Sequence, residues 1–129
     1  MLSKINHIGV AVKNIKKTMD FYCKILGFME PDIIETSEMM VAMIKVGEVT
    51  IELMQSTSQS GAIARFIEKK GEGVQHICLE VDEIGKEIER IKSMGYEFVD
   101  ENPRKGVEGD IVFLKPKNTF GVLFELVQL

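Results

Sequence analysis

The sequence has only two histidines and two cysteines, and it lacks a long apolar run. Cys23 and Cys78 form no CxxC pair and no evident disulfide framework, so we interpret both as buried free thiols, which are typical of the reducing cytoplasm. No apolar segment approaches the roughly 20 residues of a membrane span, and the N-terminus lacks the apolar segment of a signal peptide. We therefore expect a cytoplasmic protein without a membrane partner.

A basic surface is also missing. Sixteen basic residues against twenty acidic ones give a net charge of −4, whereas broad binding to nucleic acid requires a basic face. Hydrophobic residues make up 45% of the 129 residues and charged residues 28%, which is typical of a soluble globular chain. The length predicts one domain with a real core and no nucleic-acid partner.

A repeated pattern is present. His7 begins HIGVAVKNI and His76 begins HICLEVDEI, so that one valine and two isoleucines recur at the same offset as the histidines. Each segment is followed by apolar residues at helical spacing, and each helix is predicted to end near a glycine, Gly27 or Gly95. Asn14 and Asp82 are the predicted N-caps.

Three β-rich runs follow each predicted helix. The first set covers about residues 28–36, 39–46 and 49–55, and the second covers about 96–102, 110–115 and 121–128. Gly47-Glu48 is a predicted tight hairpin, and Lys117-Asn118-Thr119 a longer one. Between the halves, Ile63, Phe66 and Ile67 indicate a short connecting helix.

The predicted fold class is therefore α+β, built from two βαβββ modules. Module one covers residues 1–56, the connector 57–73 and module two 74–129, all within one domain. A half of about 60 residues cannot bury its sheet face alone. We expect the modules to be related by a pseudo-twofold and to form a curved, incomplete barrel around a shared concavity.

Strand parity assigns the histidines and two glutamates to the faces turned away from the helices. Successive strand side chains point to opposite faces, so His7 is opposed to Ile8 and His76 to Ile77. In VTIELM and VLFELV, the glutamate is likewise opposed to its apolar neighbours. A carboxylate in a central strand is costly unless something pairs with it.

One such residue alone is usually a hydrogen-bonded core histidine or a solvated glutamate. Two matched sets favour a different interpretation, because convergent nitrogen and oxygen ligands make a divalent metal site with room for water or substrate. The predicted metal ligands are His7, Glu52, His76 and Glu125.

The segments HIGVAVKNI, FYCKILGF, VTIELM, RFIEKKGEGVQHICLEVDEI and FLKPKNTFGVLFELVQ resemble the vicinal oxygen chelate superfamily, and within it the methylmalonyl-CoA epimerases. The resemblance covers residues 5–128. It assigns the same four residues to the family's metal-ligand positions, with one divalent ion per chain (Co, Ni, Mn, Fe or Zn). It also implies an acyl-CoA substrate and a homodimer.

The implied reaction is metal-dependent epimerisation at C2 of methylmalonyl-CoA through an enolate. Proton transfer then needs groups on both faces of a planar intermediate. We assign Glu125 as one base and Glu52 as the other, while Glu38 and Glu48 are weaker candidates that fit solvated turns. Lys115 is the predicted substrate-binding residue, ahead of three other basic residues, Arg104, Lys105 and Lys117.

The chain departs from the family pattern in three places. It has Gln75-His76 where epimerases usually have two histidines, and Lys115-Pro116-Lys117 where they usually have His-Pro-Lys. An acidic residue proposed as a base in some members lies on the strand at 39–46, which here reads MMVAMIK and has none. Met39, Met40 and Met43 there are predicted to pack in the core.

Three alternatives remain open. Glyoxalase I, a lactoylglutathione lyase, shares the ligand set, but its members typically carry an arginine where this chain has Ala11. A ring-cleaving dioxygenase uses two histidines and one carboxylate and usually needs further histidines, which this chain lacks. A non-catalytic small-molecule-binding member of the superfamily typically lacks the metal ligands.

Overall fold

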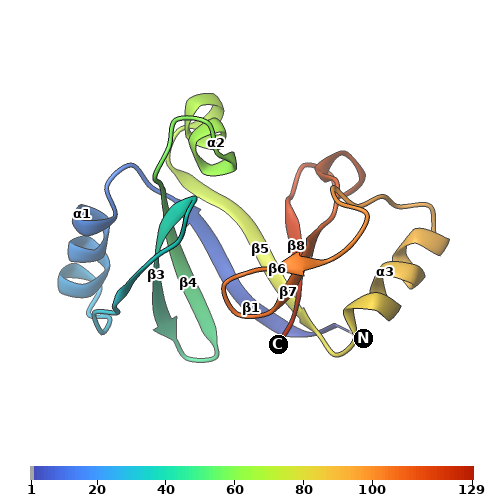
Figure 1. Cartoon of the computed structure of the whole chain (residues 1–129). Helices are drawn as coiled ribbons and strands as arrows, with labels where there is room; N and C mark the ends of the chain where they lie inside the picture. Colours follow the sequence, from blue (N-terminus) through green and yellow to red (C-terminus); the bar gives the residue numbers. More distant parts are fainter. Residues whose placement is uncertain (1) are drawn as a thin grey trace. The chain divides into compact units, whose positions relative to one another are not determined.

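The computed structural model describes residues 2–129, and the chain forms two compact units (Figure 1). The N-terminal unit comprises His7–Gln75, and the C-terminal unit comprises the residues up to Asn6 together with His76–Leu129. Two long strands, β1 (Leu2–Ala11) and β5 (Gly73–Val81), each contribute residues to both units. Among residues 2–129, no helix has the length and apolar character needed to cross a membrane.

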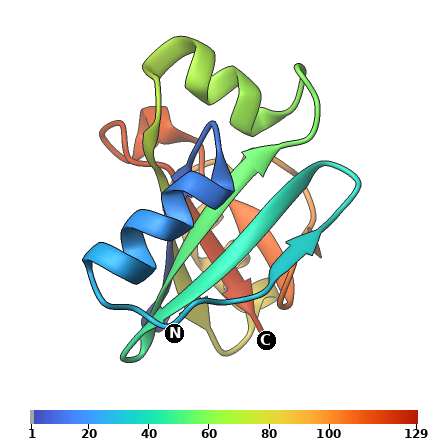
Figure 2. The same ribbon diagram turned by 90° about the vertical axis from the view of Figure 1, so that its left-hand side faces the viewer.

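The N-terminal unit contains a sheet with the strand order β2-β3-β4-β1. Strand β4 pairs in parallel with β1, and the remaining pairs are antiparallel. Figure 2 shows helix α2 at one end of the β3–β4 hairpin. The elements after β1 are α1 (Ile15–Asp20), the π-helical turn η1 (Phe21–Ile25), β2 (Ile33–Glu35), β3 (Met39–Val46), β4 (Val49–Ser56) and α2 (Ala62–Lys70).

The C-terminal unit repeats this plan with the strand order β5-β8-β7-β6. Strand β8 is parallel to β5, and the other pairs are antiparallel. The beginning of β1 belongs to this unit, where the Ser3 hydroxyl donates a hydrogen bond of 3.1 Å to the Glu80 carbonyl oxygen. The elements after β5 are α3 (Ile84–Ser93), β6 (Arg104–Lys105), β7 (Asp110–Phe113), the 3₁₀ turn η2 (Pro116–Asn118) and β8 (Phe124–Gln128).

Each unit therefore has the predicted β-α-β-β-β order, and each packs its first helix on the predicted strand face. In the N-terminal unit, Ile15 and Met19 of α1 pack with Val12 and Leu53. In the C-terminal unit, Ile84 and Ile88 pack with Val81, Val112 and Leu126. This apolar burial explains why the period-2 strands and the amphipathic helices hold together.

The opposite sheet faces are closed differently in the two units. Helix α2 covers part of the N-terminal face, where Ile63 packs with Ala11, Val41 and Met54. Met39 and Met43 pack against this cluster and Met40 against the other, as predicted. In the C-terminal unit, strand side chains alone form the equivalent cluster, which consists of Cys78, Ile111, Val127 and Phe113.

In each unit, a glutamine from the last strand accepts a hydrogen bond from the first backbone N–H of the first helix. The Ile15 N–H donates to Gln55 Oε1 and the Ile84 N–H donates to Gln128 Oε1, each at 2.8 Å. Asn14 is the N-cap of α1, as predicted, and its Oδ1 accepts a hydrogen bond from the Lys17 N–H. The prediction of Asp82 as the second N-cap was wrong. The N-cap is Glu83, and its side chain makes no capping bond.

The predicted strand at 96–102 was also wrong. Phe98 forms only an isolated bridge with Leu114, and the outer strand is the short β6. The run of charged and turn-forming residues from Asp100 to Pro103 ends the pairing, because proline has no N–H to donate. The predicted hairpin at Gly47 is confirmed, whereas the turn predicted at 117–119 is largely 3₁₀ helix. Both cysteines are free, but Cys23 is only half-buried.

Candidate metal and substrate site

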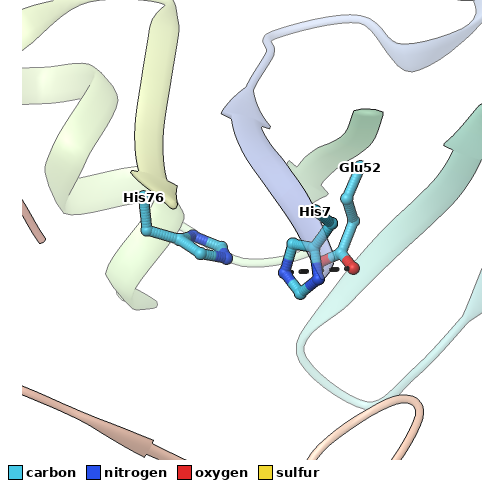
Figure 3. Close-up of side chains that lie close together, drawn as sticks. All are labelled: His7, Glu52 and His76. Atoms are coloured by element: carbon cyan, nitrogen blue, oxygen red, sulfur yellow. Dashed lines mark ion pairs between the residues drawn. The ribbon is translucent and has the colours of Figure 1, made fainter. Parts of the chain in front are cut away.

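The N-terminal unit brings His7 and Glu52 together on the sheet face away from α1. The parallel β1–β4 register places Gly9 opposite Glu52, and His7 lies two residues earlier on the same face. Figure 3 shows the two side chains directed toward each other, with His7 Nε2 and Glu52 Oε2 3.6 Å apart. Only 8% and 7% of these side chains are exposed, so the carboxylate and the imidazole are both buried.

The C-terminal unit contains the same arrangement with His76 and Glu125. The parallel β5–β8 register places Cys78 opposite Glu125, and His76 precedes Cys78 by two residues. His76 Nε2 and Glu125 Oε1 are again 3.6 Å apart, and the exposed fractions of the side chains are 3% and 6%. The Phe113 ring meets the His76 ring edge to face, with centroids 5.6 Å apart and an interplanar angle of 85°, so it restricts the orientation of the imidazole.

The donor atoms of each pair suit a divalent metal ion. A nitrogen and an oxygen that each lie about 2.1 Å from one ion can be separated by up to about 4.2 Å. The observed 3.6 Å falls within this limit and exceeds the usual length of a direct hydrogen bond. Imidazole and carboxylate are ligands that cobalt, nickel, manganese, iron and zinc accept. The residues present therefore fit a metal.

The strands next to the two glutamates add apolar neighbours that the sequence patterns did not place beside them. Met43 of β3 is directly opposite Glu52, and Phe113 of β7 is directly opposite Glu125. Directly opposed side chains lie on the same sheet face, so each carboxylate has one apolar flank. The signal that could have identified them was the pairing register, which requires the correct hairpin lengths.

Lys115 lies at the start of the β7–β8 loop (residues 114–123) and pairs with a carboxylate. Its Nζ donates to Glu97 Oε2 at 2.8 Å, and Lys117 Nζ is 3.8 Å from the same oxygen. The Lys115 hydrogen bond, with the charges of both lysines, lowers the pKa of Glu97 below its ordinary value. Lys115 and Glu97 line an open pocket with Tyr96, Phe98, Asp100 and Glu101.

The weaker candidates lie elsewhere in ordinary surroundings. Arg104 is 3.6 Å from Asp100, and Lys105 is 2.7 Å from Asp110, so both cations already have carboxylate neighbours on the surface. Glu38 and Glu48 are exposed at the ends of strands. This agrees with their interpretation as solvated turn residues.

Comparison with known proteins identifies the family. The profile of the glyoxalase/bleomycin resistance protein/dioxygenase superfamily matches residues 4–126. The chain belongs to this superfamily, which confirms the predicted fold class.

The relatives include methylmalonyl-CoA epimerases. The human mitochondrial methylmalonyl-CoA epimerase is 33% identical, and the match covers 98% of this chain and 74% of the human protein. The crystal structure of methylmalonyl-CoA epimerase from Mycobacterium tuberculosis superposes with a TM-score of 0.92 at 29% identity, covering 98% of this chain and 88% of the other. A hypothetical protein from Bacillus halodurans C-125 gives a TM-score of 0.94 at 32% identity, with 98% and 94% covered.

Proposed function

We propose that this protein is a metal-dependent epimerase that inverts C2 of methylmalonyl-CoA. The observation that carries the proposal is the occurrence of two buried His–Glu pairs at equivalent strand positions, each with the same 3.6 Å separation. Relatives named methylmalonyl-CoA epimerase support the substrate. A neighbouring structure of a methylmalonyl-CoA epimerase in complex with methylmalonyl-CoA, at a TM-score of 0.92 and 31% identity, supports it further.

In this proposal the ligands of one divalent ion are His7, Glu52, His76 and Glu125. When bound, the ion supplies Lewis-acid stabilisation of negative charge that develops on the substrate oxygens. The histidines are the fixed donors. Each glutamate has two carboxylate oxygens, so one oxygen can serve as a ligand while the other exchanges a proton.

The chain's own contribution to the chemistry is proton transfer at C2. One glutamate, as carboxylate, takes the C2 proton, and the electron pair of the C–H bond passes into the thioester to form an enolate. The other glutamate, in its protonated form, then returns a proton to the opposite face, which inverts the configuration. We assign these roles to Glu125 and Glu52 because both carboxylates are buried, on the strand faces opposite α1 and α3.

The remaining assignments are the expectations drawn from the sequence. We expect Lys115 to contact the substrate once its ammonium group leaves Glu97. We also expect the chain to act as a single domain, to form a homodimer and to work in the cytoplasm. Gel filtration with light scattering tests the dimer.

One observation counts against a glyoxalase reaction. The Ala11 position, where glyoxalase I members typically carry an arginine, is completely buried against Val41, Met54 and Ile63. Its methyl group carries no charge. The position cannot present a cation to the carboxylate of glutathione.

The experiment that tests the proposal follows C2 by NMR in deuterated water. Protein loaded with each of the five divalent metals is incubated with one epimer of methylmalonyl-CoA, and the expected result is inversion with solvent deuterium at C2. Protein treated with a chelator should show neither, and readdition of metal should restore both.

Two outcomes would overturn the proposal. Conversion of the hemithioacetal of methylglyoxal and glutathione, without exchange at C2 of methylmalonyl-CoA, would identify a glyoxalase. Inactivity toward both substrates, with metal bound, would identify a non-catalytic binding protein.

A further inference from the structure

Phe120 in the β7–β8 loop has an unusual conformation and an unusual exposure. Its φ angle of 57° lies in the left-handed region, where a side chain other than that of glycine, asparagine or aspartate is strained. The side chain is also 99% exposed, the largest value among the exposed hydrophobic residues of the described chain. Exposed apolar residues are common, but one held in a strained backbone conformation needs a reason.

The loop imposes this conformation through several backbone hydrogen bonds. The Asn118 N–H donates to the Lys115 carbonyl oxygen at 3.0 Å, and the Gly121 N–H donates to the Pro116 carbonyl oxygen at 3.0 Å. The Thr119 hydroxyl lies within hydrogen-bond distance of the Pro116 and Val122 carbonyl oxygens. Phe120 is therefore presented by a defined turn.

Asn118, two residues before Phe120, adds a second destabilising feature to the loop. Asn118 Oδ1 is buried without a hydrogen-bond partner, and it is the one such side-chain atom found among residues 2–129. An unsatisfied buried acceptor destabilises a fold. Two adjoining costs in one short loop indicate that this conformation serves a purpose other than stability.

The loop also lies next to half of the candidate site. It leads directly into β8, where Glu125 is the second residue, and the Ile77 N–H beside His76 donates to the Leu123 carbonyl oxygen at 3.1 Å. Glu125 follows Phe120 by five positions in the chain, so their Cα atoms are at most about 17 Å apart. The loop is therefore within reach of the part of an acyl-CoA that follows the thioester when the reacting carbon lies at Glu125.

We propose that Phe120 is a substrate-binding residue that packs against the pantetheine arm of the acyl-CoA; the inference rests on the proposed function. The arm carries methylene groups and a geminal dimethyl group, which offer apolar surface to an aromatic ring. Adenine lies farther from the thioester in an extended acyl-CoA, beyond the reach set by the short loop. The two lysines that share Glu97 lie at the start of the same loop and give it a net positive charge beside an anionic ligand.

The test compares wild type with Phe120→Asn, because asparagine tolerates the left-handed region and removes the ring. Binding is measured by calorimetry with three unreactive thioesters of propionate: those of CoA, pantetheine and N-acetylcysteamine. We expect the variant to bind the CoA and pantetheine thioesters about tenfold more weakly and the shortest thioester equally well. Its melting temperature should equal or exceed that of wild type, because backbone strain is relieved.

Met29→Asn is the matched control, since Met29 is 88% exposed and lies in the N-terminal unit. It should leave all three affinities unchanged. Equal weakening for all three thioesters, or weakening for the CoA thioester alone, would overturn the assignment to the pantetheine arm. Epimerisation by Phe120→Asn at the wild-type kcat/KM would overturn the inference but not the proposed function. If the wild-type protein epimerises nothing but Phe120→Asn still loses affinity for the CoA and pantetheine thioesters, the proposed function is wrong and the inference about Phe120 stands.

Discussion

The two units hold their carboxylates in matching rows of three strand residues, and the rows differ only at the flanks. In the N-terminal unit, Glu52 lies between Gly9 and Met43. In the C-terminal unit, Glu125 lies between Cys78 and Phe113. The glutamate and its histidine are repeated, whereas a glycine replaces a cysteine and a flexible thioether replaces an aromatic ring.

The repeated residues supply the reactive atoms, whereas the residues that differ set the shape around them. A ligand and a proton acceptor need particular atoms, so histidine and glutamate recur in both units. The flanking residues only fill volume, and that volume can differ between the two faces of a substrate. His76 is held by the Phe113 ring, whereas Met43 is a flexible side chain beside Glu52. We therefore expect the two carboxylates to act on different faces with unequal efficiency.

The largest effect should come from replacing each carboxylate by its amide. An amide cannot accept the C2 proton, so Glu125→Gln and Glu52→Gln should each lower the epimerisation rate by about 10³-fold. Each variant should still exchange the C2 proton of one epimer, the one that faces the remaining carboxylate, and the two variants should prefer opposite epimers. Deuterium exchange measured on each pure epimer checks this.

Exchange of both epimers by either variant would show that one base serves both faces. Circular dichroism of the variants provides the control for folding, because the amide has the same shape as the carboxylic acid.

The second effect concerns metal occupancy. His7→Ala and His76→Ala should each reduce the bound metal, measured by elemental analysis, well below one ion per chain while the protein stays folded. His76→Ala should have the larger effect because Phe113 holds the wild-type imidazole in place and so lowers the entropic cost of binding. Full occupancy in both variants would contradict the metal assignment.

The third effect compares the two glutamines that bind the helix starts. Gln55→Ala and Gln128→Ala each leave a helix N–H without its acceptor, so the free energy of unfolding should fall by about 1–2 kcal/mol. The loss should be greater for Gln128→Ala, because α1 keeps its Asn14 cap and α3 has no side-chain cap. Denaturant unfolding measures both. Replacement by glutamate, which keeps an acceptor, should recover most of the stability, and a lack of recovery would contradict the hydrogen-bond explanation.

A smaller effect on the free energy of unfolding follows from the different N-caps of α1 and α3. Asn14→Ala should lower the free energy of unfolding by about 1 kcal/mol. Glu83→Asn should raise it by a few tenths, because a new cap offsets the loss of the exposed Lys86 contact. Thermal unfolding of both variants against wild type checks the sign, and equal losses in both would show that the Glu83 position cannot be capped.

The smallest effect is a pH dependence confined to the C-terminal unit. The pKa of Glu97 is lowered in the folded protein, first by its hydrogen bond to Lys115. Its stabilising contribution is therefore present above the unfolded pKa of about 4.3 and is lost as the pH falls through the folded value. The difference in melting temperature between wild type and Glu97→Gln should be small at pH 7 and should vanish on acidification. A difference that persists at pH 2 would contradict this.

The sequence by itself determined the repeat, the order of elements and the residues proposed for the site. The repeat was visible because His7 and His76 begin segments with the same apolar spacing. Strand parity then separated Glu52 from Leu53 and Glu125 from Leu126, since a period of two assigns a face without any knowledge of the partner strand. The core clusters agree with both assignments.

Only the tertiary structure decided which residues are neighbours across strands. The outer strand of the C-terminal unit lies at Arg104–Lys105 and not at 96–102, and Glu83 rather than Asp82 precedes α3. Met43 and Phe113 became visible as flanks only through the register, and the strain at Phe120 only through its backbone angle. Pairing and turn geometry depend on contacts between residues far apart in the chain, which local propensity does not encode.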